Sequence, residues 1–330
     1  MSKRSIIEKI IRLTAIKASY PLNYMIPVYH SVSDGGIPHI KHVINYKSRK
    51  QFERDIDYMA KNFQFADWDF FKKNIEKPAS KPLALMTFDD GFYEFKDIIL
   101  PILERKGIYA INFINPAFIG NKDLMFRCKI SLLIEKCSTL SSVPSPLLKF
   151  LGLKNDSGKE LIEKLKSINY NNQNILTEIA KILAIDFSDY LKNNKVYLNN
   201  EDLIQIKNKG YGIAAHSWDH PYYHELPMDK QLKNTNLSLD YMKENNFLDD
   251  TFAFPFTDFG VKNDFFVKLF NENNDLKYTF GSAGVKLDSF SKNLQRVPME
   301  NGLSAEEELK FQNSYFMLKK FINKNTIIRE

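Results

Sequence analysis

Short apolar runs alternate with amphipathic segments along most of this chain, and no other feature restricts its fold as strongly. Runs such as PLALMTF (82–88), YAINFI (109–114), YGIAAHS (211–217), TFAFPF (251–256) and NLQRVPM (293–299) have the length and composition of strands. Segments between such runs, among them 48–63, 200–210 and 228–246, carry apolar residues at helical spacing. Ser48 is a good N-cap for the first of these helices, and Gly210 is a plausible end of the second. Because strands that alternate with helices form a parallel sheet or barrel, the sequence predicts an α/β fold of that kind.

One long stretch, from about 122 to 200, interrupts this alternation. It is rich in Lys, Asn, Leu and Ile, several helical patterns run through it, and the tract NYNNQN marks a polar loop. We predict a mainly helical insertion in one domain that spans 23–330. Insertions after barrel strands usually fall on the catalytic face, so we expect this one near the mouth of the barrel, where it would influence substrate choice.

Residues 1–22 are predicted to form an amphipathic helix. Within 3–17, Ile and Leu alternate with Lys and Arg at roughly helical spacing. Such a helix either packs on its own domain or makes peripheral contact with an anionic membrane. The segment lacks the apolar core and cleavage site of a secretory signal, and no stretch of the sequence is apolar enough to span a bilayer. A cytoplasmic protein is expected, with membrane contact through 3–17 as an alternative.

Charge and cysteine content narrow the classes of function further. The 330-residue chain has a formal net charge of +6, with Lys and Arg spread along its length. No arginine-rich arm or nucleic-acid-binding motif is visible, so nucleic acid is not an expected partner. Cys128 and Cys137 have no CxxC spacing, which argues against a disulfide framework or a structural zinc site.

Two adjacent carboxylates, Asp89 and Asp90, close one of the predicted strands. Neighbouring buried anions repel each other and need an opposite charge nearby. Either both acids face water on a turn, or a cation lies beside them.

A histidine-rich segment, HSWDHPYYH, closes another predicted strand. It supplies His216 and His220, and His224 follows one helical turn later. Two imidazoles four residues apart can share a metal, and one added carboxylate gives the three-ligand pattern of a catalytic zinc site. Carboxyl ends of parallel barrel strands meet on one face, so a metal there would also supply the cation that the Asp pair needs. Taken singly, each motif fits a solvated turn or structural histidines equally well.

The segments TFDDG (87–91) and HSWDH (216–220) resemble the first two motifs of the polysaccharide deacetylases, carbohydrate esterase family four. Flanking segments are similar too, and the resemblance covers most of the chain outside 122–195. It implies a distorted or incomplete (β/α) barrel. The activity implied is metal-dependent hydrolysis that removes an acetyl group from an N-acetylated sugar.

Carried over by residue, the resemblance implies Asp89 as the catalytic base. One divalent metal would be held by Asp90, His216 and His220; zinc is the expected ion, with cobalt or nickel as alternatives. Thr87 and Ser217 would orient the ligands.

The third family motif, Arg-x-Pro-Tyr-Gly, is largely lost in AFPFT (253–257). Pro255 is retained, Ala253 replaces the arginine that orients the base, and Phe256 replaces the tyrosine. The backbone N–H of Phe256 could still serve as an oxyanion donor. Arg296 either supplies the missing charge or forms a salt bridge at a strand end.

The late Leu-x-His motif, which supplies the general acid, is absent, and no histidine follows His224. His30 closes the first strand and is the preferred replacement, with Glu300 second; a hydrogen-bonded structural role for His30 is the alternative. The predicted substrate contacts are Phe256, Pro255, His224 and Trp218, although the phenylalanine could equally be core and His224 a surface residue.

The partner implied by the resemblance is an acetamido sugar, within a glycan or a lipid- or nucleotide-linked precursor. Two other functions fit the same residues. One is a catalytically impaired barrel that binds a glycan or acts as a scaffold. The other is an amidohydrolase of a small non-sugar amide, which a closed pocket too small for a hexose would favour.

Overall fold

Eight parallel strands form the central sheet of the computed structural model, which describes residues 20–154 and 157–330. Their order is β11-β9-β8-β7-β6-β5-β2-β12. The bounds are Pro27–Tyr29 (β2), Met86–Asp89 (β5), Ala110–Ile114 (β6), Gly212–Ala215 (β7), Leu248–Ala253 (β8), Tyr278–Gly281 (β9), Asn293–Gln295 (β11) and Val297–Pro298 (β12). The helix predicted for 1–22 lies, apart from its last three residues, outside the described residues.

The two edge strands of this sheet belong to one stretch of chain. Only Arg296 separates β11 from β12; β11 pairs with β9, and β12 pairs with β2 at the other edge. The sheet therefore curls into a nearly closed barrel with one seam. This confirms the predicted distorted (β/α) barrel, although the strand predicted over 293–299 is interrupted at Arg296.

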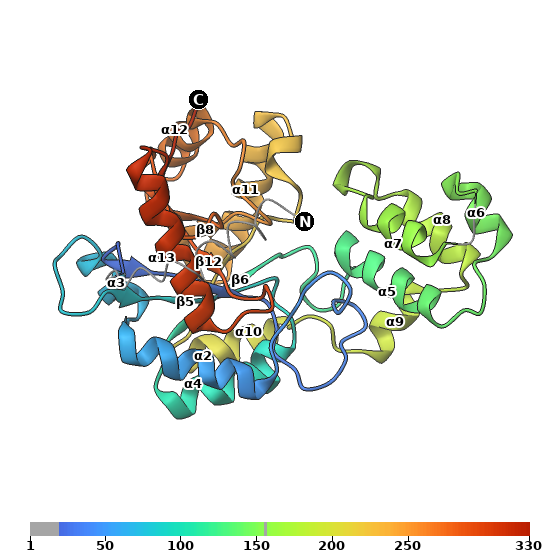
Figure 1. Ribbon diagram of the computed structural model, residues 1–330, viewed down its shortest axis with the longest axis horizontal. Helices are drawn as coiled ribbons and strands as arrows, with labels where there is room; N and C mark the ends of the chain where they lie inside the picture. Colours follow the sequence, from blue (N-terminus) through green and yellow to red (C-terminus); the bar gives the residue numbers. More distant parts are fainter. Residues whose placement is uncertain (1–19, 155–156) are drawn as a thin grey trace.

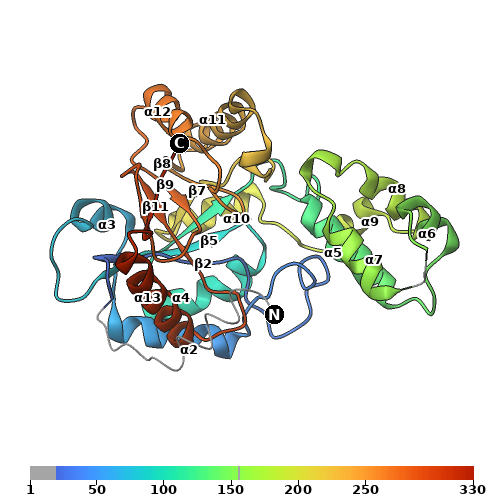
Figure 2. The same cartoon turned by 45° about the horizontal axis from the view of Figure 1, so that its top comes forward.

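Helices surround the strands in both views (Figures 1 and 2). Their bounds are Arg49–Asn62 (α2), Trp68–Asn74 (α3), Leu100–Lys106 (α4), Asn200–Asn208 (α10), Met228–Glu244 (α11), Asn263–Glu272 (α12) and Ala305–Phe321 (α13). A π-helical turn, Phe95–Ile99, leads into α4. At the start of α2, Ser48 accepts a hydrogen bond from the Gln51 amide, as its N-cap position predicts. Their apolar faces and the sheet enclose the main core.

A separate lobe of helices, green in Figures 1 and 2, lies beside the barrel. It comprises Phe126–Ser138 (α5), Ser145–Leu151 (α6), Gly158–Lys166 (α7), Ile175–Ile182 (α8) and Phe187–Asn193 (α9). The lobe packs around a second apolar cluster, which also includes Ile40 and Phe92 from the barrel side. Tyr197 joins it to the barrel, since its ring stacks on that of Phe92 with centroids 5.5 Å apart. The mainly helical insertion is thus present.

Two small sheets complete the fold. One contains Tyr24–Met25 (β1), Leu83–Ala84 (β4) and Gln64–Phe65 (β3), and the other pairs Leu287–Asp288 (β10) with Thr326–Ile327 (β13). The predicted strand TFAFPF is displaced, because β8 begins at Leu248 and ends at Ala253. Among the described helices, none has the length and hydropathy required to cross a bilayer.

Candidate metal centre

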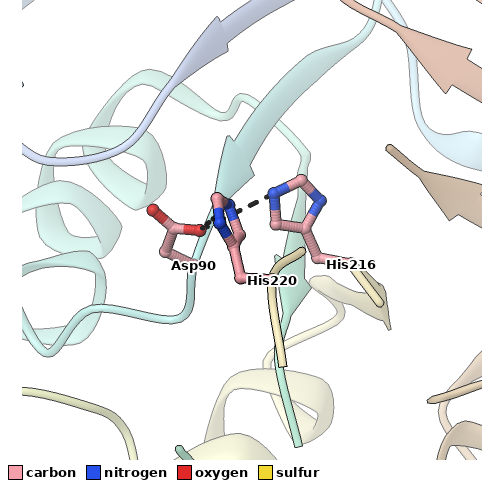
Figure 3. A group of neighbouring side chains, drawn as sticks. All are labelled: Asp90, His216 and His220. Atoms are coloured by element: carbon pink, nitrogen blue, oxygen red, sulfur yellow. Dashed lines mark ion pairs between the residues drawn. The ribbon is translucent and has the colours of Figure 1, made fainter. Parts of the chain in front are cut away.

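Asp90, His216 and His220 converge at the carboxyl ends of β5 and β7 (Figure 3). One donor atom of each lies within 4.8 Å of the others. Asp90 Oδ1 is 3.1 Å from His220 Nε2 and 3.6 Å from His216 Nε2. A tetrahedral zinc ion, with bonds of about 2.0–2.2 Å, holds its ligand atoms about 3.4 Å apart. The spacing therefore suits three ligands of one cation.

The same three donor atoms are buried without hydrogen bonds. Asp90 Oδ1, His216 Nε2 and His220 Nε2 have no hydrogen-bond partner among the described residues. The side chains are only 1–3% exposed, so water does not compensate. Because unpaired buried polar atoms are costly, a cation that binds all three would offset a real penalty. This donor set fits a divalent metal.

Strained backbone holds these ligands in place. Asp90, Ser217 and His220 have φ angles of 75°, 69° and 62°, in the left-handed region that residues other than glycine seldom adopt. Such strain is typical of functional sites, where the surrounding structure enforces it. The Asn115 side chain donates to the backbone carbonyls of His216 and Ser217, and Ser217 Oγ accepts from the His220 amide at 3.1 Å.

Of the two residues predicted to orient the ligands, Ser217 contacts one directly through this amide hydrogen bond. Thr87 differs, because its hydroxyl donates to the Pro27 carbonyl at 2.7 Å and so ties β5 to β2. A role for Thr87 in ligand orientation stays a prediction.

The protonation state of the ligands favours metal binding. His216 Nδ1 lies 2.9 Å from the Ala253 carbonyl, which can only accept, so Nδ1 carries the proton and Nε2 presents its lone pair to the site. Burial lowers the pKa of His216 to about 4, which keeps the ring neutral near pH 7. Burial raises the pKa of Asp90, but the interaction with the neighbouring His220 imidazole lowers it by more, so the net shift is downward and Asp90 is a carboxylate. Metal ligands must be deprotonated in this way.

Asp89 lies beside the three candidate metal ligands and forms a buried, bidentate ion pair with Arg296. Arg296 Nη1 and Nη2 donate to the two carboxylate oxygens at 2.6 and 2.7 Å. Asp89 Oδ2 is 3.5 Å from His216 Nε2. Burial raises the pKa of Asp89, but Arg296 and His216 lower it by a larger amount. The net shift of the pKa is therefore downward, and the carboxyl group is ionised. The sequence allowed Arg296 either to supply the charge missing at Ala253 or to form a salt bridge at a strand end. One contact fits both, because the salt-bridge partner of Arg296 is Asp89.

His30 and Glu300 form a second coupled pair. His30 Nδ1 is 2.5 Å from Glu300 Oε2, and the carboxylate also accepts from the amides of His30 and Ser31. Burial lowers the pKa of His30, but the Glu300 charge outweighs it and raises the pKa to about 9. His30 and Asp89 line the same cavity. Glu300 is not in the described lining and contacts His30 through its Nδ1 atom.

A cavity of about 530 Å³ leads from the candidate metal ligands Asp90, His216 and His220, called the metal group below, to the inserted lobe. This volume is typical of small-molecule sites. Besides the residues above, its lining includes His42, Arg127, Cys128, Lys166, Tyr222, Phe256 and Ser282. The Phe256 ring stacks on Tyr222, with centroids 3.9 Å apart, and its centroid is 4.3 Å from that of His220.

The other three predicted substrate contacts, Pro255, Trp218 and His224, are not in the described lining of this cavity. His224 is exposed in the short helix Tyr223–Glu225, and Pro255 is buried. Their contact with a substrate stays a prediction. Sequence reasoning missed Arg127 and Lys166, because both lie in the insertion, where no strand end marks them.

Several deacetylases of known structure have a similar fold. A deacetylase from Streptococcus pyogenes, PplD in complex with acetate, matches with a TM-score of 0.53 and 16% identity over 88% of this chain and 97% of that one. A polysaccharide deacetylase from Bacillus cereus gives 0.52 and 11% over 88% and 68%. A de-N-acetylase from Aggregatibacter actinomycetemcomitans gives 0.51 and 11% over 87% and 99%.

No protein-family model matches the sequence, and no curated protein matches it. At identities of 11–16%, the structural likeness concerns the fold. The expected resemblance to the polysaccharide deacetylases is confirmed at that level.

Proposed function

We propose that this chain is a divergent polysaccharide deacetylase, a metal-dependent hydrolase that removes the acetyl group from an acetamido sugar. The observation that carries the proposal is an ionised carboxylate, Asp89, fixed by Arg296 beside a buried, unsatisfied set of metal-type donors. The fold shared with deacetylases supports it. The substrate would be a glycan or a lipid- or nucleotide-linked precursor.

Asp90, His216 and His220 would hold the divalent metal, zinc being the first choice for a carboxylate and two imidazoles. When bound, the metal supplies a Lewis acid that polarises the amide carbonyl and lowers the pKa of water.

The remaining steps belong to side chains and backbone of this chain. Asp89 would accept the proton of the attacking water, since Arg296 keeps it ionised and oriented. The amide of Phe256, which donates to no described residue, would stabilise the oxyanion. His30 would give a proton to the leaving amine as the C–N bond breaks, so that amide and water become acetate and amine.

Two replacements compensate for the degenerate motifs in this proposal. Arg296, the residue between β11 and β12, would take the place of the motif arginine that is absent at Ala253. His30, held by Glu300, takes the place of the missing Leu-x-His histidine, which makes Glu300 a positioning residue. These replacements argue against an impaired barrel. The cavity of about 530 Å³ accommodates a sugar and argues against a site restricted to small amides.

Replacement of the proposed base tests this function. Asp89→Asn should retain one metal per chain and lose acetate release by about 100-fold or more, the usual contribution of a positioned base. The assay measures acetate from N-acetylated oligosaccharides and from lipid- and nucleotide-linked acetamido sugars, with metal content determined by mass spectrometry. Asp97→Asn, at an exposed aspartate nearby in the chain, is the matched control. Ordinary turnover in Asp89→Asn, or no acetate from metal-loaded wild type on any substrate, would refute the proposal.

A further inference from the structure

At its outer end, beside the inserted lobe, the cavity is lined by two basic residues that have no ion-pair partner in the described part of the chain. Arg127, in the first turn of α5, and Lys166, at the end of α7, both line it. Neither forms an ion pair with a residue in 20–154 or 157–330. The acidic residues of the described lining, Asp89 and Asp90, lie at the metal end, and Asp89 is already paired with Arg296. Charge at the outer end is therefore uncompensated.

Arg127 is held in a fixed orientation. Its Nη1 donates to the Lys166 carbonyl at 2.9 Å and its Nη2 to the Tyr222 hydroxyl at 2.6 Å. The guanidinium carbon lies 5.7 Å from the ring centroids of Tyr222 and Phe256. These contacts use only some of the N–H donors of a guanidinium, and both acceptors are neutral. An oriented cation with free donors is an anion-binding element, unlike a solvated surface arginine.

One aromatic ring spans the interval between this cation and the metal group. Phe256 is 5.7 Å from the Arg127 guanidinium carbon on one side, and its centroid is 4.3 Å from that of His220 on the other. A sugar ring is similar in width to a phenyl ring. A sugar whose acetamido group lies at the metal ligands can therefore place an anionic substituent beside Arg127.

We infer that Arg127, with Lys166, binds a phosphate group of the substrate, and that the substrate class is a phosphorylated acetamido sugar. The inference rests on the proposed function, which orients the acetamido group. The Arg127 fork suits phosphate oxygens, and Lys166, a lining residue of the same cavity, adds a second positive charge. A doubly charged group matches two positive charges better than a carboxylate does. The shared chemistry is a sugar-linked phosphate, whether free, nucleotide-linked or lipid-linked.

Binding of two matched probes tests the inference. N-acetylglucosamine 1-phosphate and N-acetylglucosamine are titrated calorimetrically into the full-length, metal-loaded chain carrying Asp89→Asn, which prevents turnover. The measured quantity is the ratio of the two dissociation constants, so effects on sugar binding itself cancel. We expect at least a 10-fold preference for the phosphorylated probe. Arg127→Met should reduce this ratio about 10-fold, as loss of a charge-assisted hydrogen bond predicts.

Further variants separate binding from folding. Lys166→Met, at an exposed side chain that the fold tolerates, should reduce the preference less, and Arg127→Lys should restore only part of it because the fork is lost. Lys164→Met, on the same helix but outside the described lining, should leave the ratio unchanged. Equal affinity for both probes in the Asp89→Asn parent, or a preference that survives Arg127→Met and Lys166→Met, would overturn the inference.

Nucleotide- and polyprenyl-diphosphate-linked N-acetylglucosamine serve as two further arms. Tighter binding of either, lost in Arg127→Met, supports the inference and identifies the source of the phosphate. Failure of the two proposals is distinguishable. Acetate release by the wild type without phosphate preference would overturn the inference alone, whereas Arg127-dependent preference without acetate release from any substrate would overturn the proposed function alone.

Discussion

Ala253 serves the site through its backbone, at the position where the resembling motif has an arginine. The arginine of the family motif is absent there, yet the Ala253 carbonyl accepts from His216 Nδ1 at 2.9 Å and fixes the tautomer of that ring. The charge next to Asp89 comes from Arg296, the residue between β11 and β12. Backbone and side-chain roles have thus separated between two residues.

The metal group gives the first residue-level prediction. His216→Ala should abolish stoichiometric zinc, because it removes one of three ligand atoms and leaves too few for tight binding. Metal content after dialysis, measured by mass spectrometry, checks this. His224→Ala, at an exposed histidine eight positions away, should retain one zinc per chain. Full zinc occupancy in His216→Ala would mean that the metal, if any, binds elsewhere.

The proposed general acid gives the second prediction. His30→Ala should reduce acetate release about 100-fold or more while metal content stays constant, since the leaving amine then lacks a proton donor. Glu300→Gln should have a smaller effect in the same direction, because it removes the charge that raises the pKa of His30. Initial rates and metal content are measured together. Ordinary turnover in His30→Ala would show that His30 is not the general acid.

Among the structural elements, the connection from β2 to α2 has two functions. Ile40 and His42 in it line the cavity, while His39 packs between Phe92 of the barrel side and Tyr190 of α9. His39 Nδ1 lies 3.1 Å from the Tyr190 hydroxyl, and Nε2 is buried without a partner in the described part of the chain. One wall of the cavity therefore depends on a neutral imidazole.

This imidazole makes stability depend on pH. Burial lowers the pKa of His39 to about 4, whereas an unfolded histidine titrates near 6.5. Between these values the unfolded state binds one more proton, so the free energy of unfolding falls as pH falls, by about 1.4 kcal/mol per pH unit. Urea unfolding of wild type and His39→Gln from pH 7 to pH 4 checks this. The wild type should show the steeper decline.

The exposed His224 provides the control for the pH series. His224→Gln should follow the wild-type curve, because that side chain is exposed. Parallel curves for wild type and His39→Gln would show that His39 does not contribute to the pH dependence.

For the molecule as a whole, residues near its carboxyl end hold distant parts together. Arg329 pairs with Asp258, in the loop after β8, and with Asp288 of β10, and all three side chains are about 2% exposed or less. Asp258 also accepts hydrogen bonds from Asn293 and Gln295 of β11. A buried network thus connects the end of the chain to the loop next to Phe256.

Removal of one charge from this network should destabilise the entire fold. Arg329→Met leaves two buried carboxylates without their cation, and we expect the free energy of unfolding to drop by about 3–5 kcal/mol. Arg49→Met, which removes an exposed pair with Asp34, should cost about 1 kcal/mol or less. Urea unfolding of both variants measures the difference. Equal stability of the two would show that the buried network is not needed.

Much of this architecture follows from local pattern. The strand runs, the N-cap at Ser48 and the glycine after α10 are local signals, and Asp90, His216 and His220 follow the ends of two predicted strands. Pairing of Asp89 with Arg296 depends on closure of the barrel over 207 residues of separation, which no local pattern encodes. Arg127 belongs to an insertion whose packing against the barrel depends on tertiary contacts. The periodicity of apolar residues therefore could not predict that Arg127 lines the cavity.

Closure of the barrel by the segment from β11 to β12 also has a consequence for synthesis on the ribosome. Proteins emerge from the amino end, so Asp89 and His30 are made long before the partners that fix them, Arg296 and Glu300. A nascent chain that has emerged to residue 220 contains Asp90, His216 and His220, but it lacks the partners that fix Asp89 and His30. The proposed hydrolysis, which needs both pairs, therefore requires about nine-tenths of the chain to be translated first.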